Sequence, residues 1–106
     1  MAKKPRLLDL LKKDLEDRQS EHDVLGQKVF VSPMSIDEQL TINAMHPADS
    51  ALQMAEMLVR KCRDEDGQPV FTKDDKPALK REVAGDRLAP LIAAINGRSV
   101  QDQVKN

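Results

Sequence analysis

Aromatic residues are scarce in this chain of 106 residues, which has no Trp, no Tyr and two Phe. Proteins that bind single-stranded nucleic acid stack its bases on aromatic side chains, so this composition disfavours that class of protein. An excess of one charge sign is missing too, because 17 Lys and Arg stand against 18 Asp and Glu. Such a balance gives no strong field to attract DNA or an anionic membrane. We therefore expect no nucleic acid and no membrane as partner.

The side chains that hold metals or attack substrates are few and scattered. The single cysteine, Cys62, has no second cysteine for a disulfide and no CxxC or Cys/His companion for zinc, and we expect it to be a small buried side chain. The histidines, His22 and His46, are far apart in the sequence and form no metal set. No serine stands in a G-x-S-x-G context. We expect no metal, no cofactor and no enzymatic activity.

Long apolar runs are also missing. A membrane-spanning helix needs about 20 apolar residues, and the leucine-rich start is interrupted by charges and lacks a signal-peptide core. We therefore expect a cytoplasmic protein. The length suits a single core. The pattern divides the chain into an N-terminal amphipathic helix and linker (1–26), a helical domain (27–97) and a flexible tail (98–106).

Hydrophobic periodicity predicts a mainly α-helical fold, a compact bundle of four to five helices with at most one short β-strand pair. Residues 28–31 and 69–71 are the candidates for that pair. The predicted helices are a leucine-striped segment within 5–19, one over 36–45, one over 50–62, a short one around Leu79 and Val83, and one that ends at Ile95.

Capping signals set the ends of several predicted helices. Ser35 and Glu38 have the S-x-x-E spacing of a capping box, and Pro47 ends that helix near Met45. Asp86 is the expected cap of the last helix, which would place Pro90 in its first turn. The apolar row of the helix after Ser35 is Ile36, Leu40 and Ala44, and that of the following helix is Ala51, Ala55, Leu58 and Cys62.

The acidic stretch DEDGQPVFTKDD (64–75) is a candidate calcium loop. With Gly67 as the sixth loop residue, Asp64 and Asp66 take ligand positions, but Cys62 and Lys73 take the first and twelfth. The carboxylates that calcium needs most are therefore missing. A catalytic carboxylate pair would need an apolar pocket to separate the two pKa values, whereas this stretch is hydrophilic.

A structural connector explains the same residues better. Asp66 and Gly67 form a turn pair because glycine accepts a positive φ. Pro69 holds the following segment extended, and Phe71 is the apolar group that anchors it. Thr72 starts a T-x-x-D pattern that opens the next helix. The stretch is therefore predicted to be a helix–turn–extended–helix connector.

Together with the segments around it, this connector resembles the corresponding part of the tail assembly chaperones of long-tailed bacteriophages. The resemblance covers roughly residues 28–96 and rests on a helix rich in Ala and Leu, the segment CRDEDGQPVFTKDDKPAL, and two further helices. The extended segment VFVSPMSIDEQ before them also fits the family. The residues that match the family's turn pattern are Asp64, Asp66, Gly67, Phe71, Asp75 and Leu79.

The resemblance implies a non-enzymatic protein of a phage or prophage. Such chaperones bind the tape measure protein, help to recruit major tail tube subunits, and are absent from the mature virion. Many also exist in a longer, frameshifted form. Two alternatives stay open: a small helical DNA-binding regulator, and a structural tail component that would be present in virions.

Exposed apolar side chains are the candidate partner surface. Methionines suit adaptable surfaces because they are flexible and polarizable. Met57 falls outside the apolar row of its helix, and Leu7 and Leu11 belong to the stripe of the first helix. These three residues are the candidate partner surface. Packing of the first helix on its own domain, a core position for the methionine, and self-association are left open.

Overall fold

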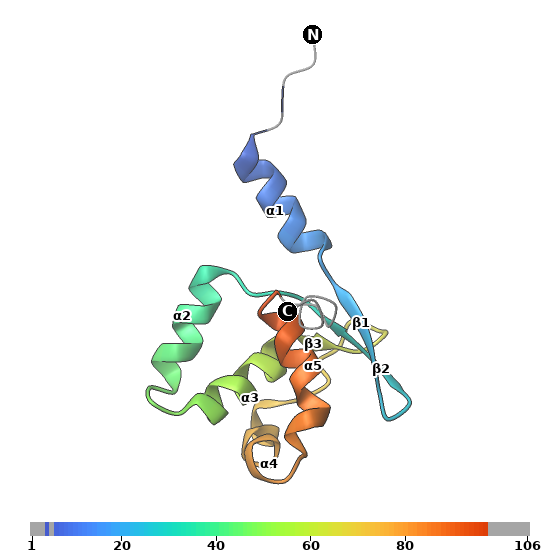
Figure 1. Ribbon diagram of the computed structural model, residues 1–106, viewed down its shortest axis with the longest axis vertical. Helices are drawn as coiled ribbons and strands as arrows, with labels where there is room; N and C mark the ends of the chain where they lie inside the picture. The colour runs from blue at the N-terminus through green and yellow to red at the C-terminus, as the bar shows by residue number, and fades with distance from the viewer. Residues whose placement is uncertain (1–3, 5, 98–106) are drawn as a thin grey trace, which may run out of the picture.

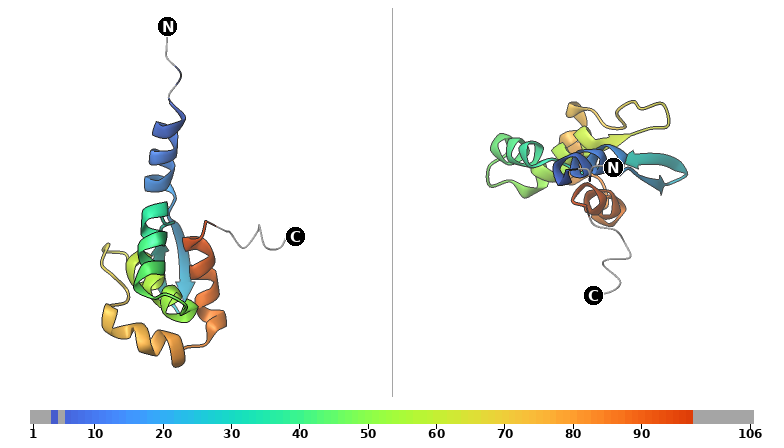
Figure 2. Two further views of the ribbon diagram at one scale, coloured as in Figure 1. Left: turned by 90° about the vertical axis from the view of Figure 1, so that its left-hand side faces the viewer. Right: turned by 90° about the horizontal axis from the view of Figure 1, so that it is seen from above.

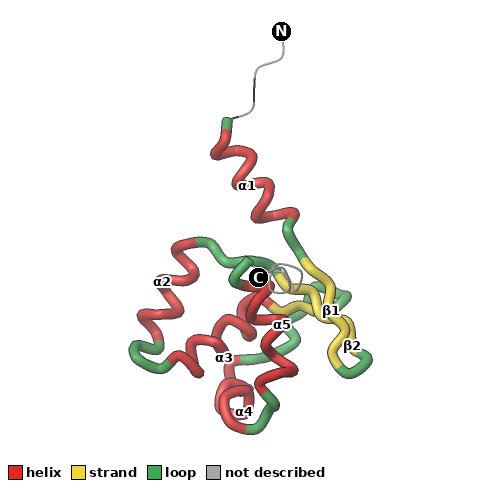
Figure 3. The backbone as a smooth tube through the Cα atoms, viewed as in Figure 1, coloured by secondary structure: helices red, strands yellow, loops and turns green. Residues whose placement is uncertain are grey.

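Five helices and a three-stranded antiparallel sheet make up the described part of this computed structural model, residue 4 and residues 6–97 (Figures 1 and 3). In chain order the elements are α1 (Leu7–Asp17), β1 (Ser20–Val24), β2 (Gln27–Val31), α2 (Ile36–Met45), α3 (Ser50–Lys61), β3 (Cys62–Arg63), the 3-10 turn η1 (Lys73–Asp75), α4 (Lys76–Arg81) and α5 (Gly85–Ile95). The mainly helical class is confirmed. Within these residues, no helix is long and apolar enough to cross a membrane.

The sheet corrects the prediction of at most one strand pair and of a linker that ends at Gly26. β1 pairs with β2 in an antiparallel hairpin, and Leu25 and Gly26 form its turn with φ of 52° and 87°. β1 has Val24 as its one apolar residue, so period-2 hydrophobicity gave no signal there. The predicted second strand, residues 69–71, contributes a single bridge from Pro69 to Arg63 of β3.

Local capping chemistry sets most helix ends as predicted. The Glu38 amide donates to Ser35 Oγ at 3.2 Å and the Ser35 amide donates to Glu38 Oε1 at 3.1 Å, so the capping box is present. The start of α5 differs, because the helix begins at Gly85 with Asp86 in its first turn and without a side-chain cap. Pro90 therefore lies inside α5 and not in its first turn.

α3 is the centre of the fold. It packs against α2, α4 and α5, and Leu58 in its C-terminal half is 1% exposed. Cys62, at the end of α3, is buried as predicted. The core continues into the inward face of β2 and the buried row of α5, and its members are Val29, Val31, Ile42, Ala55, Met57, Leu58, Cys62, Leu79, Leu88, Leu91 and Ile95.

α1 stands apart from this body. Figures 1 and 2 show it extending from the start of β1, at the end of the molecule opposite α4. None of its residues is buried. α1 therefore lacks the packing that stabilises the other helices.

Substitution of Leu58 by Ala should lower the free energy of unfolding by about 2–5 kcal/mol, because the deletion leaves a cavity in the closed part of the core. The matched control is Leu40→Ala, at a side chain that is 62% exposed, which should change that free energy by about 0.5 kcal/mol or less. Urea unfolding followed by circular dichroism measures both. Equal losses for the two variants would contradict this assignment of the core.

Candidate partner-binding surfaces

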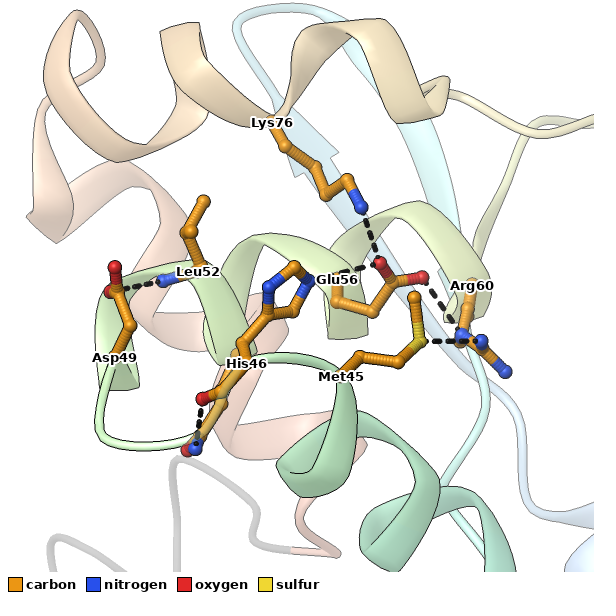
Figure 4. A network of polar contacts seen from close by, with 8 residues as sticks. Met45, His46, Asp49, Leu52, Glu56, Arg60 and Lys76 are labelled. Carbon is orange, nitrogen blue, oxygen red and sulfur yellow. Dashed lines mark hydrogen bonds and ion pairs between the residues drawn. The ribbon is translucent and has the colours of Figure 1, made fainter.

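A buried carboxylate joins three helices at the centre of the body (Figure 4). Glu56 of α3 is 5% exposed. Its Oε1 accepts a hydrogen bond from Lys76 Nζ of α4 at 2.7 Å, and its Oε2 accepts one from Arg60 Nε at 2.8 Å. His46, at the end of α2, places Nε2 at 3.5 Å from Oε1. A buried charge needs such partners, so this network fixes α2 and α4 against α3.

The partners of Glu56 decide its ionisation. Burial raises the pKa of this carboxyl, but hydrogen bonds from Lys76 and Arg60 and the charge of Lys76 outweigh burial and lower the pKa to about 2. Glu56 is therefore charged at neutral pH. It serves here as a structural ion, since its oxygens are occupied by side chains of the protein.

α2 faces the body with polar residues that have charged partners there, so an apolar face of the helix points outward. The inward row of α2 contains Ile42 with two polar residues, Glu38 and His46. Lys61 Nζ donates to both oxygens of Glu38 at 3.1 Å. Burial raises the pKa of Glu38, but the hydrogen bond from the Ser35 amide and the contact with Lys61 outweigh burial and lower it. The apolar row predicted from the sequence lies on the opposite, exposed side, with Ile36 79% and Leu40 62% exposed. It consists of Ile36, Leu40 and Ala44, all exposed.

α1 presents a second exposed apolar face. Leu7 is 69% and Leu11 55% exposed, so both are available as the predicted partner surface requires. The polar side of the helix holds ion pairs one turn apart, including Arg18 with Asp14 at 2.7 Å. The exposed leucines of α1 are Leu7, Leu8, Leu10, Leu11 and Leu15. An apolar helix face of this kind is typical of a surface that binds another protein.

Met57 does not share this exposure. Its side chain is 8% exposed and lies in the core, which corrects the expectation that it faces a partner. The prediction assumed that a residue outside the apolar row of its helix is exposed. It was wrong because α2, α4 and α5 all pack against α3, so residues outside that row are buried too. The neighbouring Met54 is 44% exposed and lines the groove described next.

An apolar groove of about 480 Å³ lies between α3 and α5, and residues of α4 also line it. Its walls include the small side chains Ala55 and Ala89, and Leu79 and Val83 contribute the larger apolar surface. Lys80 is the charged residue among its described lining residues. The groove has the shape and polarity that suit an apolar helix.

The acidic stretch is a connector in the structure. Asp64 Oδ1 accepts hydrogen bonds from the amides of Asp66 at 2.8 Å and Gln68 at 2.9 Å, so it closes the turn. Gly67 has a φ of 79°. Asp75 Oδ2 accepts from the Thr72 amide at 2.8 Å. Phe71 packs at the edge of the core and Leu79 lies within it.

Chemically reactive groups do not converge in the described part of the chain. No group of three or more His, Cys, Asp or Glu side chains there is arranged to hold a metal ion. Burial raises the pKa of the Cys62 thiol to about 12, so the reactive thiolate is scarce. Ser20 Oγ lies 2.8 Å from His22 Nε2, and burial lowers the pKa of His22. This contact was not predicted, because residues 20–26 were read as a linker.

No protein-family model and no curated protein matches the sequence. Among solved structures, the fold is similar to one described as the structure of the bacteriophage HK97 tail assembly chaperone, with a TM-score of 0.57. The match covers 84% of this chain and 96% of that chain at 15% sequence identity. The resemblance named from the sequence is thus confirmed at the level of the fold.

The pairing of Glu56 predicts how stability depends on pH. The folded pKa of about 2 lies below the ordinary value of 4.5, so the unfolded chain binds the proton more readily. This contribution is present in full above about pH 5 and is lost as the pH falls towards 2, and it amounts to about 3 kcal/mol. The variant Glu56→Gln should lack this part of the pH dependence.

Urea unfolding between pH 2 and pH 7 measures the effect of Glu56→Gln. Glu65→Gln is the matched control, because Glu65 is exposed and belongs to the connector. Between pH 2 and pH 5, the free energy of unfolding of the control should depend on pH as it does in wild type. If the free energy of unfolding of Glu56→Gln still falls between pH 5 and pH 2 as steeply as that of wild type, other carboxylates cause the loss of stability in acid.

Proposed function

We propose that this chain is a phage or prophage tail assembly chaperone, which binds the tape measure protein and helps to recruit major tail tube subunits during tail assembly. The observation that carries the proposal is the match in fold to the HK97 tail assembly chaperone over 84% of this chain. The protein acts by binding, without catalysis or a cofactor, in the cytoplasm of the bacterial host. It leaves the tail before the virion is mature.

The exposed row of α2 is the surface that we assign to the tape measure protein. Ile36 and Leu40 are the apolar side chains of that row with the greatest exposure, and the ion pairs of Glu38 and Glu56 hold the helix in place behind them. A long helical partner with exposed apolar side chains would cover this row by a helix-to-helix contact.

The prediction is that the chain keeps the tape measure protein soluble. When the two proteins are produced together, the tape measure protein should appear in the soluble fraction and be recovered with the chaperone in several copies. Leu40→Glu should reduce that recovery at least about tenfold, since the charge must be desolvated at the contact. Pull-down with quantitative gel densitometry measures the ratio.

Thr41→Glu is the matched control, because it places the same charge on the adjacent exposed residue of α2. It should leave recovery unchanged. An insoluble, unbound tape measure protein in the presence of the wild-type chain would refute the proposed function. Detection of the chain in purified virions would favour a structural tail component instead.

A further inference from the structure

β1 is an edge strand of the sheet. The strand order β1-β2-β3 gives it a single neighbour, β2. Figures 1 and 2 show the hairpin of these two strands projecting from the body on the side away from α2. An edge strand presents a row of backbone N–H and C=O groups that can pair with another chain, unless the protein covers them. The outer side of β1 is therefore a surface on which a further strand could bind.

The register of the hairpin shows which backbone groups point outward. Opposed residues in an antiparallel pair alternate between pairs that exchange hydrogen bonds and pairs that do not. Val24 and Gln27 flank the two-residue turn and form a bonded pair, so His22 also directs its backbone groups towards β2. Glu21 and Asp23 direct theirs away from β2. No residue outside the sheet bonds to these groups in the described part of the chain, so two N–H and two C=O groups are available.

A cleft lies between β1 and α5. Two hollows of about 420 and 170 Å³ form it, and both are lined by His22 of β1 and Pro90 of α5. Ser20 Oγ lies 2.8 Å from His22 Nε2, and the two side chains share the face of β1 that is turned towards α5. Val31 and Ala94 add apolar surface to the larger hollow. A side chain that points to this face from an added strand therefore meets a partly apolar cleft.

The other face of β1 is exposed and acidic. Glu21 and Asp23 alternate with the half-buried residues, so their side chains point away from the cleft. Phe30 lies opposite Glu21 and Lys28 opposite Asp23, yet neither carboxylate forms an ion pair within the described residues. Asp23 Oδ1 accepts a hydrogen bond from the Gly26 amide at 2.9 Å. Opposite charges across a strand pair stabilise it, so an added strand is favoured when it places cations beside these carboxylates.

We propose that an extended, basic segment of a partner protein adds to the outer edge of β1 as a fourth strand, antiparallel like the rest of the sheet. Its pattern is basic–apolar–basic. The basic residues lie opposite Asp23 and Glu21, and the apolar residue between them lies opposite His22 and points into the cleft.

The charge of the edge disfavours a second copy of β1 as the added strand. When two β1 strands pair antiparallel through these backbone groups, Glu21 lies opposite Asp23 or each lies opposite its own counterpart. Like charges directly opposite each other destabilise a strand pair. The occupant is therefore a different, basic segment. The inference does not rest on the proposed function, because it uses the sheet edge and leaves the row of α2 uncovered.

A short peptide tests the proposal on the full chain, labelled with nitrogen-15. The probe is acetyl-Gly-Thr-Lys-Val-Lys-Thr-Gly-amide, whose five central residues equal β1 in length. Nuclear magnetic resonance titration measures its affinity, and hydrogen exchange measures the protection of single amides. At near-saturating peptide, exchange of the Glu21 and Asp23 amides should slow about tenfold, because they become hydrogen-bonded. The His22 amide should change little, since it already faces β2.

Modified peptides separate the backbone bonds from the charges. N-methylation of the first Lys removes an amide hydrogen that faces β1 and should weaken binding at least about tenfold. N-methylation of the Val is the matched control, because its amide points away from β1, and it should change the affinity less than about twofold. Replacement of both Lys by Glu should weaken binding about tenfold.

A charge reversal in the chain tests the same contact. Glu21→Lys should weaken binding of the basic probe about tenfold and strengthen binding of the peptide with two Glu. Glu65→Lys is the matched control, because it makes the same change of charge at an exposed residue of the connector. It should bind the basic probe as wild type does.

Three results would overturn the proposal. Absence of binding would show that Glu21 and Asp23 only protect the edge from association. Binding without slower exchange of their amides would show an electrostatic contact without an added strand. Equal losses for the two N-methylated peptides would exclude the antiparallel pairing. Recovery of the tape measure protein is measured separately and with another variant, so these results leave the proposed function untouched.

Discussion

The charge buried at Glu56 is the constraint on which the rest of the body depends. A carboxylate that is 5% exposed is tolerated only with partners, and these come from α2, α3 and α4. Lys76 cannot reach Glu56 unless the connector after α3 brings the start of α4 back against it. The turn closed by Asp64 and the cap at Asp75 therefore serve the network, which explains why this hydrophilic stretch is ordered by its own hydrogen bonds.

Because polar side chains of α2 are paired with the body, apolar side chains of the same helix are left at the surface. α2 faces the body with Glu38, Ile42 and His46, so its stronger apolar row is left in solvent. α1 goes further, because it buries none of its residues. A chain with a small core usually hides its apolar helix faces, since their exposure favours association. Here these faces lie on α1 and α2, and exposed apolar faces of this kind are typical of surfaces that bind another protein.

The exposed apolar surfaces are distributed over different parts of the molecule. α1 lies at one end, the groove lined by α3, α4 and α5 reaches the other, and α2 forms a flank (Figure 1). The row with Ile36 and Leu40 is therefore separate from the leucines of α1 and from the groove.

Local structure could be predicted from the sequence: the capping box at Ser35, the end of α2 before Pro47, the turn at Gly67 and the burial of Cys62. These features depend on neighbouring residues, whose chemistry the sequence shows directly. Which helix faces are covered depends on how the elements pack together. β1 is polar and forms through its pairing with β2, Met57 is buried by several helices at once, and α2 turns its apolar row outward because Glu38 and His46 find distant partners. Such choices depend on residues far away in the chain, and hydrophobic periodicity does not contain them.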